Sequence, residues 1–358
     1  MLALLFALGL QAQAAGPAQA APQVAVEKLD RAIERGMKRL RALQADDGSF
    51  EPEERKEVCR VALTSMALWA LGEPEAVGLD AARARKAAEF LVKKQTASGG
   101  IYEPANGLPV YTSGVAARAL RTLGNVDGWP ELGAARSKVE LFVYRSAAPE
   151  SFVDSDDKAS AGPSHARTQA QRLLDEGKVS DGAARRALEF LARCEVDLSR
   201  SPARLRQPHE QRAAFDIGAF DYEDLLPMVY LELTPEQQIV LRARKALASR
   251  YTPAKNPDLT ARYGEQGFLE GKQGKFYYWL NVARTMTTLG ERELVTGDGV
   301  RHDWASEIAS QVLAAQRGDG AWVNSEARWW EGEPGITTAY AVLALKLCRR
   351  ELARTGGR

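Results

Sequence analysis

The amino-acid sequence predicts an all-α chain of about six helical hairpins, with one set of helices inside and another outside. Three observations lead to this prediction. A short motif repeats with a period near 51 residues, two types of helix alternate with very different charge, and almost no segment shows the apolar–polar alternation of β-strands. Five or six such hairpins account for most of the 358 residues.

The repeated motif follows the end of an apolar helix. It consists of Gln, two or three polar residues, Gly, any residue and a large apolar residue. Gln44 and Gln95 are 51 residues apart, and Gln316 follows after a further 221, a little over four periods. Because Gly after a helix is typical of a turn, each copy should end one helix and lead into the next. The copies are LRALQADDGSF at 40–50, LVKKQTASGGIY at 91–102 and VLAAQRGDGAWV at 312–323.

The helix after each turn is nearly free of charge, whereas the helix before it carries Arg, Lys and Glu on one face. This contrast places the uncharged helices inside and the charged helices outside. When the uncharged helices are aligned on their Ala-rich centres, Thr64, Ser113 and Thr338 share one register near the helix start. The uncharged helices are expected at 61–72, 112–124 and 337–347.

The sequence QRGDGAW at 316–322 resembles the Gln-Trp repeat of the squalene-cyclase and protein-prenyltransferase superfamily. QGKFYYW at 273–279 and HDW at 302–304 are also similar to an exported bacterial subgroup described as squalene-cyclase-like or prenyltransferase-like. The resemblance covers 30–350 and is strongest at 260–348. It implies an α/α toroid (α/α barrel), in which outer helices surround a ring of inner helices and a central cavity. It implies no established activity.

The N-terminus indicates an exported protein. Residues 2–10 form a short apolar run, and AQA at 18–20 fits the small-residue rule for signal peptidase. We expect cleavage after Ala20 and a periplasmic or extracellular location. The expected division is a signal peptide at 1–20, a disordered mature N-terminus at 21–26, a single α/α-toroid domain at 27–352 and a tail at 353–358.

Composition excludes several kinds of partner. A formal net charge of +1 with mixed signs provides no electrostatic footprint for nucleic acid. No later apolar run is long enough for a transmembrane segment. Cys59, Cys194 and Cys348 are scattered among apolar helical segments, so we expect buried free thiols. No metal and no cofactor are expected, and the oligomeric state is left open.

An Asp-rich run, Asp154, Asp156 and Asp157 in FVDSDDKAS, has the letters that cyclases use to protonate an alkene. Crowded carboxylates raise the pKa of one member and keep it protonated. In the cyclases that it resembles, the run leads directly into an inner helix. Here the Gly-Pro pair at 162–163 interrupts the chain, and Lys158 can neutralise a carboxylate. A turn-forming loop is therefore favoured over a proton donor or a calcium site.

A second acidic cluster, in FDIGAFDYEDLLPMVYLEL at 215–233, leads into another expected inner helix. Asp216 and Asp221 are the favoured candidates for a working acid. Asp221 and Glu223 would be the pair of carboxylates in a carbohydrate-active enzyme. Favourable interaction of acids with a helix N-terminus explains the same residues without any activity.

Two activities of related toroids are excluded by missing residues. Zinc-dependent prenyltransferases require Asp, Cys and His ligands, and none of His165, His209 and His302 has a Cys nearby in the repeat register. Asp303, next to His302, instead predicts the N-cap of an outer helix. A thioester is excluded because YGEQGF at 263–268 has Tyr where the thioester Cys would stand.

Aromatic residues recur where the expected inner helices begin. Cyclases line their cavities with aromatic rings that stabilise carbocations. Ordinary core packing is the alternative, since consecutive aromatic residues cannot all face one way. We expect several of these rings to gather at one mouth of the ring and form an apolar pocket. The candidate ligand-binding residues are Tyr111, Tyr222, Tyr277, Tyr278, Trp329 and Trp330.

These features predict an exported, terpenoid-cyclase-like toroid that binds an apolar, isoprenoid-like small molecule or a peptide segment at its aromatic mouth. A non-catalytic protein-interaction module of the cell envelope is the alternative, and a carbohydrate-active toroid is a third hypothesis. Enzymatic activity stays open because fold alone does not define it. If present, cyclase-like chemistry is expected.

Overall fold

The computed structural model describes residues 24–54, 56–72, 79–103, 108–124, 129–147, 244–245, 247–256, 272–327 and 330–356. The regular structure of these residues is helical apart from one short antiparallel pair, β1 (Leu294–Val295) with β2 (Arg301–His302). The N-terminal helices are α1 (Val26–Arg41), α2 (Lys56–Gly72), α3 (Ala81–Lys93), α4 (Pro109–Thr122) and α5 (Pro130–Ala147). The C-terminal helices are α12 (Lys275–Leu289), α13 (Trp304–Ala314) and α14 (Pro334–Gly356).

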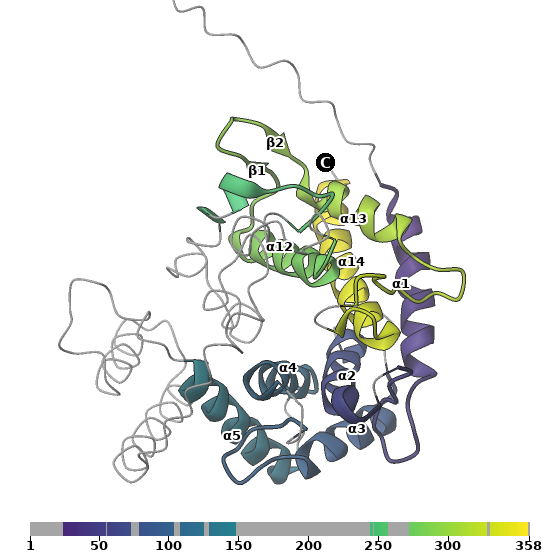
Figure 1. The fold of residues 1–358 in the computed structure, drawn as a ribbon, viewed down its shortest axis with the longest axis vertical. Helices are drawn as coiled ribbons and strands as arrows, with labels where there is room; N and C mark the ends of the chain where they lie inside the picture. The colour runs from purple at the N-terminus through teal and green to yellow at the C-terminus, as the bar shows by residue number, and fades with distance from the viewer. Residues whose placement is uncertain are drawn as a thin grey trace, which may run out of the picture.

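The helices form two curved layers (Figure 1). In the inner layer, neighbouring helices are in contact in the order α12, α14, α2 and α4. The outer layer runs α13, α1, α3 and α5 around it. The predicted inner and outer sets are therefore confirmed for the described residues, including the three inner helices expected at 61–72, 112–124 and 337–347.

Burial separates the two layers in the way that the charge contrast predicts. The outer helix α1 buries a single face, whereas the inner helix α14 is buried without interruption from Ile336 to Leu345. Along this stretch α14 touches neighbours on all sides, so its residues lose contact with water. The core that results is one continuous cluster of apolar residues extending over all the described helices.

Each repeat turn is tied to the next outer helix by the side-chain amide of its Gln. At the first turn, Gln44 Nε2 donates to the carbonyl of Gly48 at 3.2 Å and to the carbonyl of Arg83 on α3 at 3.0 Å. One amide group therefore shapes the turn and also binds the following hairpin. The same pair of bonds joins Gln95 to Gly99 and to Ala135 of α5, and Gln316 to Gly320 and to Ala32 of α1.

The Gly of the motif lies against that same outer helix. Gly48 has a φ of 89°, and a Cβ there would lie 2.3 Å from the backbone carbonyl of Lys86. Gly320 has a φ of 86°, with its hypothetical Cβ 2.9 Å from the carbonyl oxygen of Arg35. Both the left-handed backbone and the close approach require glycine. The motif thus encodes a contact between hairpins as well as a turn.

The register predicted for Thr64, Ser113 and Thr338, near the starts of three inner helices, is confirmed. In the first hairpin, the backbone N–H of Phe50 donates to Thr64 Oγ1 at 2.9 Å. Equivalent bonds run from Ile101 to Ser113 Oγ and from Trp322 to Thr338 Oγ1. Each hydroxyl satisfies a buried N–H that the turn leaves without a backbone partner.

The last hairpin packs directly against the first. In Figure 1 the purple α1 lies beside the yellow α14, and the two helices are in contact along their length. The bond from Gln316 to the Ala32 carbonyl connects these ends of the chain, as does an ion pair between Arg349 and Asp30. The layers therefore continue across the two ends of the described chain.

Several smaller expectations are confirmed. Asp303 caps α13, with Oδ1 accepting from the N–H of Ser306 at 3.2 Å. His302 packs against Tyr251, and its ring nitrogen contacts the Glu307 carboxylate at 3.1 Å. Cys59 and Cys348 are free and buried, as expected. Cys194 lies outside the described residues.

At the chain ends, α1 begins at Val26, and α14 continues to Gly356, into the segment expected as a tail. The predicted signal peptide at 1–20 lies outside the described residues and stays a prediction. Among the helices that the structure describes, none combines the length and apolar character required to cross a membrane.

The Gln316 amide supports a testable prediction. Gln316→Ala removes two hydrogen bonds to backbone carbonyls, each worth about 1 kcal/mol, so the free energy of unfolding should fall by about 2 kcal/mol. Urea unfolding followed by circular dichroism measures the change. Gln311→Ala is the matched control, because Gln311 lies on α13, the helix that leads into this turn, and the structure shows no hydrogen bond from its side chain. Equal stability of the two variants would contradict the role of the motif.

Candidate functional site at the N-terminal ends of the inner helices

Four aromatic side chains meet where three inner helices begin. Tyr111 comes from α4, Tyr277 from α12 and Tyr340 from α14, while Trp330 lies just before α14. Ring centroids are 6.0 Å apart for Tyr111 and Tyr277, and 5.5 Å apart for Tyr277 and Tyr340. The indole of Trp330 contacts Tyr111 edge-on at 6.4 Å. We call these four residues the tyrosine cluster.

The tyrosine cluster is nearly closed to water. Its side chains are between 3% and 8% exposed, and the hydroxyls of Tyr111 and Tyr340 are hydrogen-bonded to each other. Burial raises the pKa of both tyrosines well above the usual value. The hydroxyls therefore stay protonated at physiological pH, and the cluster offers apolar ring faces with a few neutral polar atoms.

A buried carboxylate, Glu331, positions one wall of this cluster. Glu331 is 0% exposed, and its Oε1 accepts from the backbone N–H of Tyr277 at 2.8 Å. Its Oε2 accepts from Asn324 Nδ2 at 2.6 Å. The N-cap residue of α12 is Gly274, which has no side chain to cap the helix. Glu331, far along the chain, supplies the cap instead. Glu331 thus determines where α12, and with it Tyr277, begins.

Burial raises the pKa of Glu331 to about 7, although Asn324 and the backbone N–H groups at the start of α12 favour the ionised form. Removal from water opposes ionisation more strongly than these donors support it. Near neutral pH the group is therefore partly protonated. Its oxygens are engaged in bonds that hold α12, so its role in the described site is to position the cluster.

The residue before it, Trp330, has a left-handed backbone, with a φ of 64°. A bulky residue in this conformation is uncommon and strained. The turn directs the Trp330 ring to the tyrosine cluster while the next side chain reaches α12. The carbonyl of Glu331 accepts from the N–H of Asn324 at 2.8 Å and from Thr337 Oγ1 at 2.7 Å, which holds the strained turn in place.

A second buried carboxylate, Glu333, ties this turn to the first hairpin. Glu333 is 0% exposed, and its two oxygens accept from the backbone N–H groups of Glu53 at 3.0 Å and Glu54 at 2.9 Å. These two residues lie two and three positions before the start of α2. The segment 330–333 therefore contacts α4, α12 and the approach to α2 together, and it links the N-terminal ends of these described helices.

The opposite end of the inner layer is basic. Trp69, near the C-terminal end of α2, is 3% exposed. The guanidinium carbons of Arg118 from α4 and Arg284 from α12 lie 5.8 Å and 5.0 Å from its ring centroid. Cations near helix C-termini are favourable. Among the described inner helices, α4 and α12 stand at the two ends of the row of contacts, and both reach the same indole.

The structure brings together three of the predicted aromatic residues, Tyr111, Tyr277 and Trp330. Tyr278 lies apart from them, since its hydroxyl donates to the carbonyl of Thr252 at 3.3 Å. Adjacent residues on a helix point in different directions, as the sequence argument anticipates. Tyr222 and Trp329 lie outside the described residues.

Sequence reasoning missed Tyr340 and the two capping carboxylates Glu331 and Glu333. Tyr340 stands two residues after Thr338, so the shared register of Thr64, Ser113 and Thr338 was the sequence signal that could have placed it near the start of an inner helix. Glu331 and Glu333 lie in the loop before the last inner helix, where nothing in the local pattern marks an acid as buried.

The candidate acids lie outside the described residues. This applies to Asp154, Asp156 and Asp157, and equally to the favoured Asp216, Asp221 and Glu223, whose roles stay predictions. Within the described ranges, no group of three His, Cys, Asp or Glu side chains could hold a metal ion.

No protein family model matches the chain, and no curated protein matches it in sequence. Among solved structures, it is similar to the type II terpene cyclase MstE from Scytonema. A complex of that enzyme with merosterolic acid A is 12% identical, with a TM-score of 0.49 over 91% of this chain and 98% of the other. A complex with geranylgeranyl dihydroxybenzoate is 12% identical, with a TM-score of 0.48 over 92% of this chain and 98% of the other.

A protein from Actinoplanes is 15% identical, with a TM-score of 0.44 over 89% of this chain and 99% of the other. Each of these alignments extends over about nine tenths of the chain. At TM-scores below 0.5, no activity and no substrate passes from these proteins to this chain.

The raised pKa of Glu331 predicts a pH-dependent stability. In the unfolded chain this carboxyl ionises near 4.5, whereas in the folded chain it stays protonated up to about 7. The unfolded state therefore loses its proton first, and the folded state is progressively disfavoured as pH rises between these values, by about 3 kcal/mol in total.

Glu331→Gln, which cannot titrate, should lack this contribution. The difference in unfolding free energy between wild type and Glu331→Gln, measured by urea denaturation from about pH 4 to about pH 8, should change by about 3 kcal/mol. Parallel pH profiles for the two proteins would show that the carboxyl is not held in its neutral form.

Proposed function

We propose that the chain forms an α/α toroid that binds an apolar, isoprenoid-like molecule at the N-terminal end of its inner helices. The observation that carries the proposal is the tyrosine cluster. Three inner helices and the strained turn before α14 each contribute a ring. The contacts between these rings join α4 to α12, which stand at the two ends of the described part of the inner layer. Rings with protonated hydroxyls present apolar faces suited to an unsaturated hydrocarbon.

The hydrogen bonds of the two buried carboxylates favour binding over catalysis. A cyclase-type proton donor must direct its acidic proton at the substrate. Glu331 and Glu333 instead accept N–H bonds from α12 and from the chain before α2. A working acid, if the protein has one, belongs to the candidates Asp216, Asp221 and Glu223.

A second candidate function is a non-catalytic interaction module that grips a partner segment. The observation in its favour is that side chains meet across the middle of the inner layer at both ends. Tyr111 touches Tyr277 at one end, and Arg118 and Arg284 flank Trp69 at the other. A terpenoid in the lipid extract of purified protein, detected by mass spectrometry, would support the isoprenoid proposal over this one.

Export to the periplasm or the cell exterior is part of the proposal and is supported by the apolar run at 2–10 and AQA at 18–20. N-terminal sequencing of protein recovered from the periplasmic fraction should give Ala21 as the first residue. Recovery of the uncleaved chain from the cytoplasm would contradict export.

The isoprenoid proposal is tested by titrating the protein with geranylgeraniol and following tryptophan fluorescence. Tyr277→Leu removes a ring from the tyrosine cluster but leaves an apolar side chain, so binding should weaken about five- to tenfold, which corresponds to about 1 kcal/mol. Tyr278→Leu is the matched control, because the neighbouring ring points to Thr252.

Both variants must retain the wild-type helical circular dichroism spectrum and a cooperative melting curve. Equal weakening by the two substitutions, or no binding of geranylgeraniol by the wild type, would contradict a site at the tyrosine cluster.

A further inference from the structure

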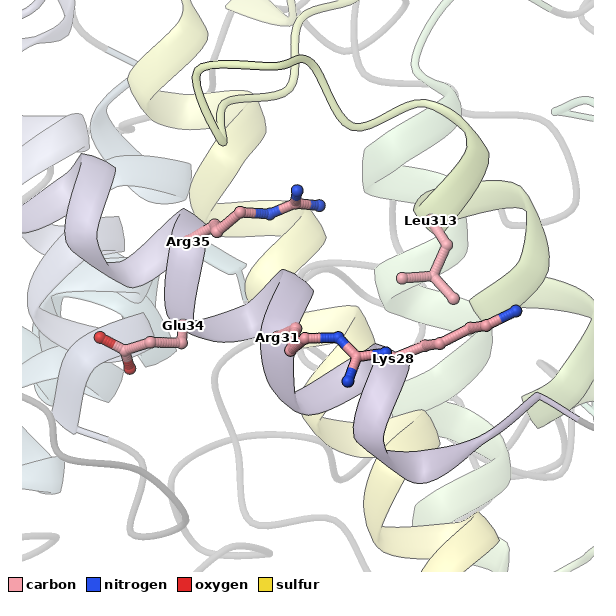
Figure 2. A pocket seen from close by; sticks show the side chains of 5 residues that line it. All are labelled: Lys28, Arg31, Glu34, Arg35 and Leu313. Atoms are coloured by element: carbon pink, nitrogen blue, oxygen red, sulfur yellow. The ribbon is translucent and has the colours of Figure 1, made fainter.

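A groove of about 510 Å³ lies on the outer face between α1 and α13, where the last hairpin meets the first (Figure 2). It is open to solvent along one side. The side chains of Lys28 and Arg31 reach from α1 toward α13, and Leu313 descends from α13 on the opposite wall. The lining residues are Lys28, Arg31, Glu34, Arg35 and Leu313.

The α1 wall of the groove is positively charged. Lys28, Arg31 and Arg35 are spaced three and four residues apart, so they lie along one face of the helix, and all three are exposed. Two acids of α1 are already paired elsewhere. Glu34 bonds to Arg41 at 2.5 Å, and Asp30 bonds to Arg349. The groove is therefore lined by three cations and one acid, Glu34, which is paired with Arg41.

One of these cations is held in position. The Arg35 guanidinium donates to Gln316 Oε1, while Nε2 of the same Gln donates to the Ala32 carbonyl at 2.9 Å. The repeat Gln therefore anchors an Arg at the edge of the groove. A guanidinium has further N–H groups in its plane, which can bind a carboxylate without losing this bond. A positioned Arg loses less entropy on binding than a free one.

We propose that this groove docks an extended acidic segment of a partner protein. Seven residues of helix separate Lys28 from Arg35, a rise of about 10 Å, which is the length of about three residues of extended chain. If the segment takes the polyproline II form of extended chain, which has three residues per turn, carboxylates three residues apart lie on one face about 9 Å from each other and would meet both ends of the cationic row. A single phosphate cannot span that distance. Leu313 offers an apolar contact to a side chain between the acids.

This docking surface is independent of the proposed isoprenoid site. The groove lies in the outer layer, whereas the tyrosine cluster lies within the inner layer. Either site can therefore fail in experiment without affecting the other. Exposed charge pairs of this kind chiefly determine specificity and association rate, so binding should be moderate and sensitive to salt.

The test uses the full mature chain and a fluorescein-labelled peptide, Glu-Thr-Val-Glu-Thr-Val-Glu, in fluorescence anisotropy. Lys28→Glu with Arg31→Glu should weaken binding at least tenfold. Lys93→Glu with Lys138→Glu, which changes the net charge equally on two other outer helices, should leave binding within about twofold. Raising NaCl from about 50 to about 500 mM should weaken wild-type binding about tenfold.

The milder pair Lys28→Ala with Arg31→Ala should weaken binding in the same direction, and melting temperatures of all variants verify folding. Equal affinity of wild type and Lys28→Glu/Arg31→Glu for the peptide would overturn the proposal. So would retention of the wild type by phosphatidylglycerol vesicles, abolished by the same variant, in the absence of any peptide binding. That result would assign the cations to a lipid surface.

Discussion

The structure depends on one side-chain amide repeated along the chain. In each described turn the Gln amide binds a carbonyl of its own turn and a carbonyl of the next outer helix, so a local bend and a contact between hairpins are formed by the same group. The motif Gly reinforces this contact, because only glycine allows the turn to touch that helix. Since Gln316 binds α1 in the same way, the repeat also joins the last hairpin to the first.

The candidate site follows from this arrangement. Inner helices held side by side bring their N-terminal ends together, and the strained segment at 330–333 fills the space between them. Two carboxylates in this segment, Glu331 and Glu333, replace the caps that the neighbouring helix and loop lack. Burying such groups is costly, and the cost is visible in the raised pKa of Glu331. The site is therefore positioned by polar groups that are themselves sealed from water, and the aromatic rings form its apolar part.

The two proposals use different layers of the molecule. The inner layer concentrates aromatic rings at one end and cations around Trp69 at the other. The outer layer keeps its charges in water, and where α1 meets α13 they line a groove. An isoprenoid-like ligand and an acidic partner segment would each meet the surface whose chemistry matches it. The closure of the repeat supports the groove, because Gln316 both joins the turn after α13 to α1 and positions Arg35.

Several features could be predicted from the sequence because each depends on residues within one period of the repeat. These are the repeat itself, the inner and outer helices, the shared register of Thr64, Ser113 and Thr338, and the Asp303 cap. Tyr111, Tyr277 and Trp330 were also predictable, since aromatic residues mark the starts of inner helices. Tyr340 and Glu331 were not. Tyr340 joins the cluster by meeting a residue 229 positions away, and Glu331 caps a helix that begins more than 50 residues earlier. Tyr340 lies in an apolar helix and becomes part of a site only because hairpins distant in sequence pack together. Glu331 lies in a loop and becomes a buried helix cap only in the three-dimensional fold.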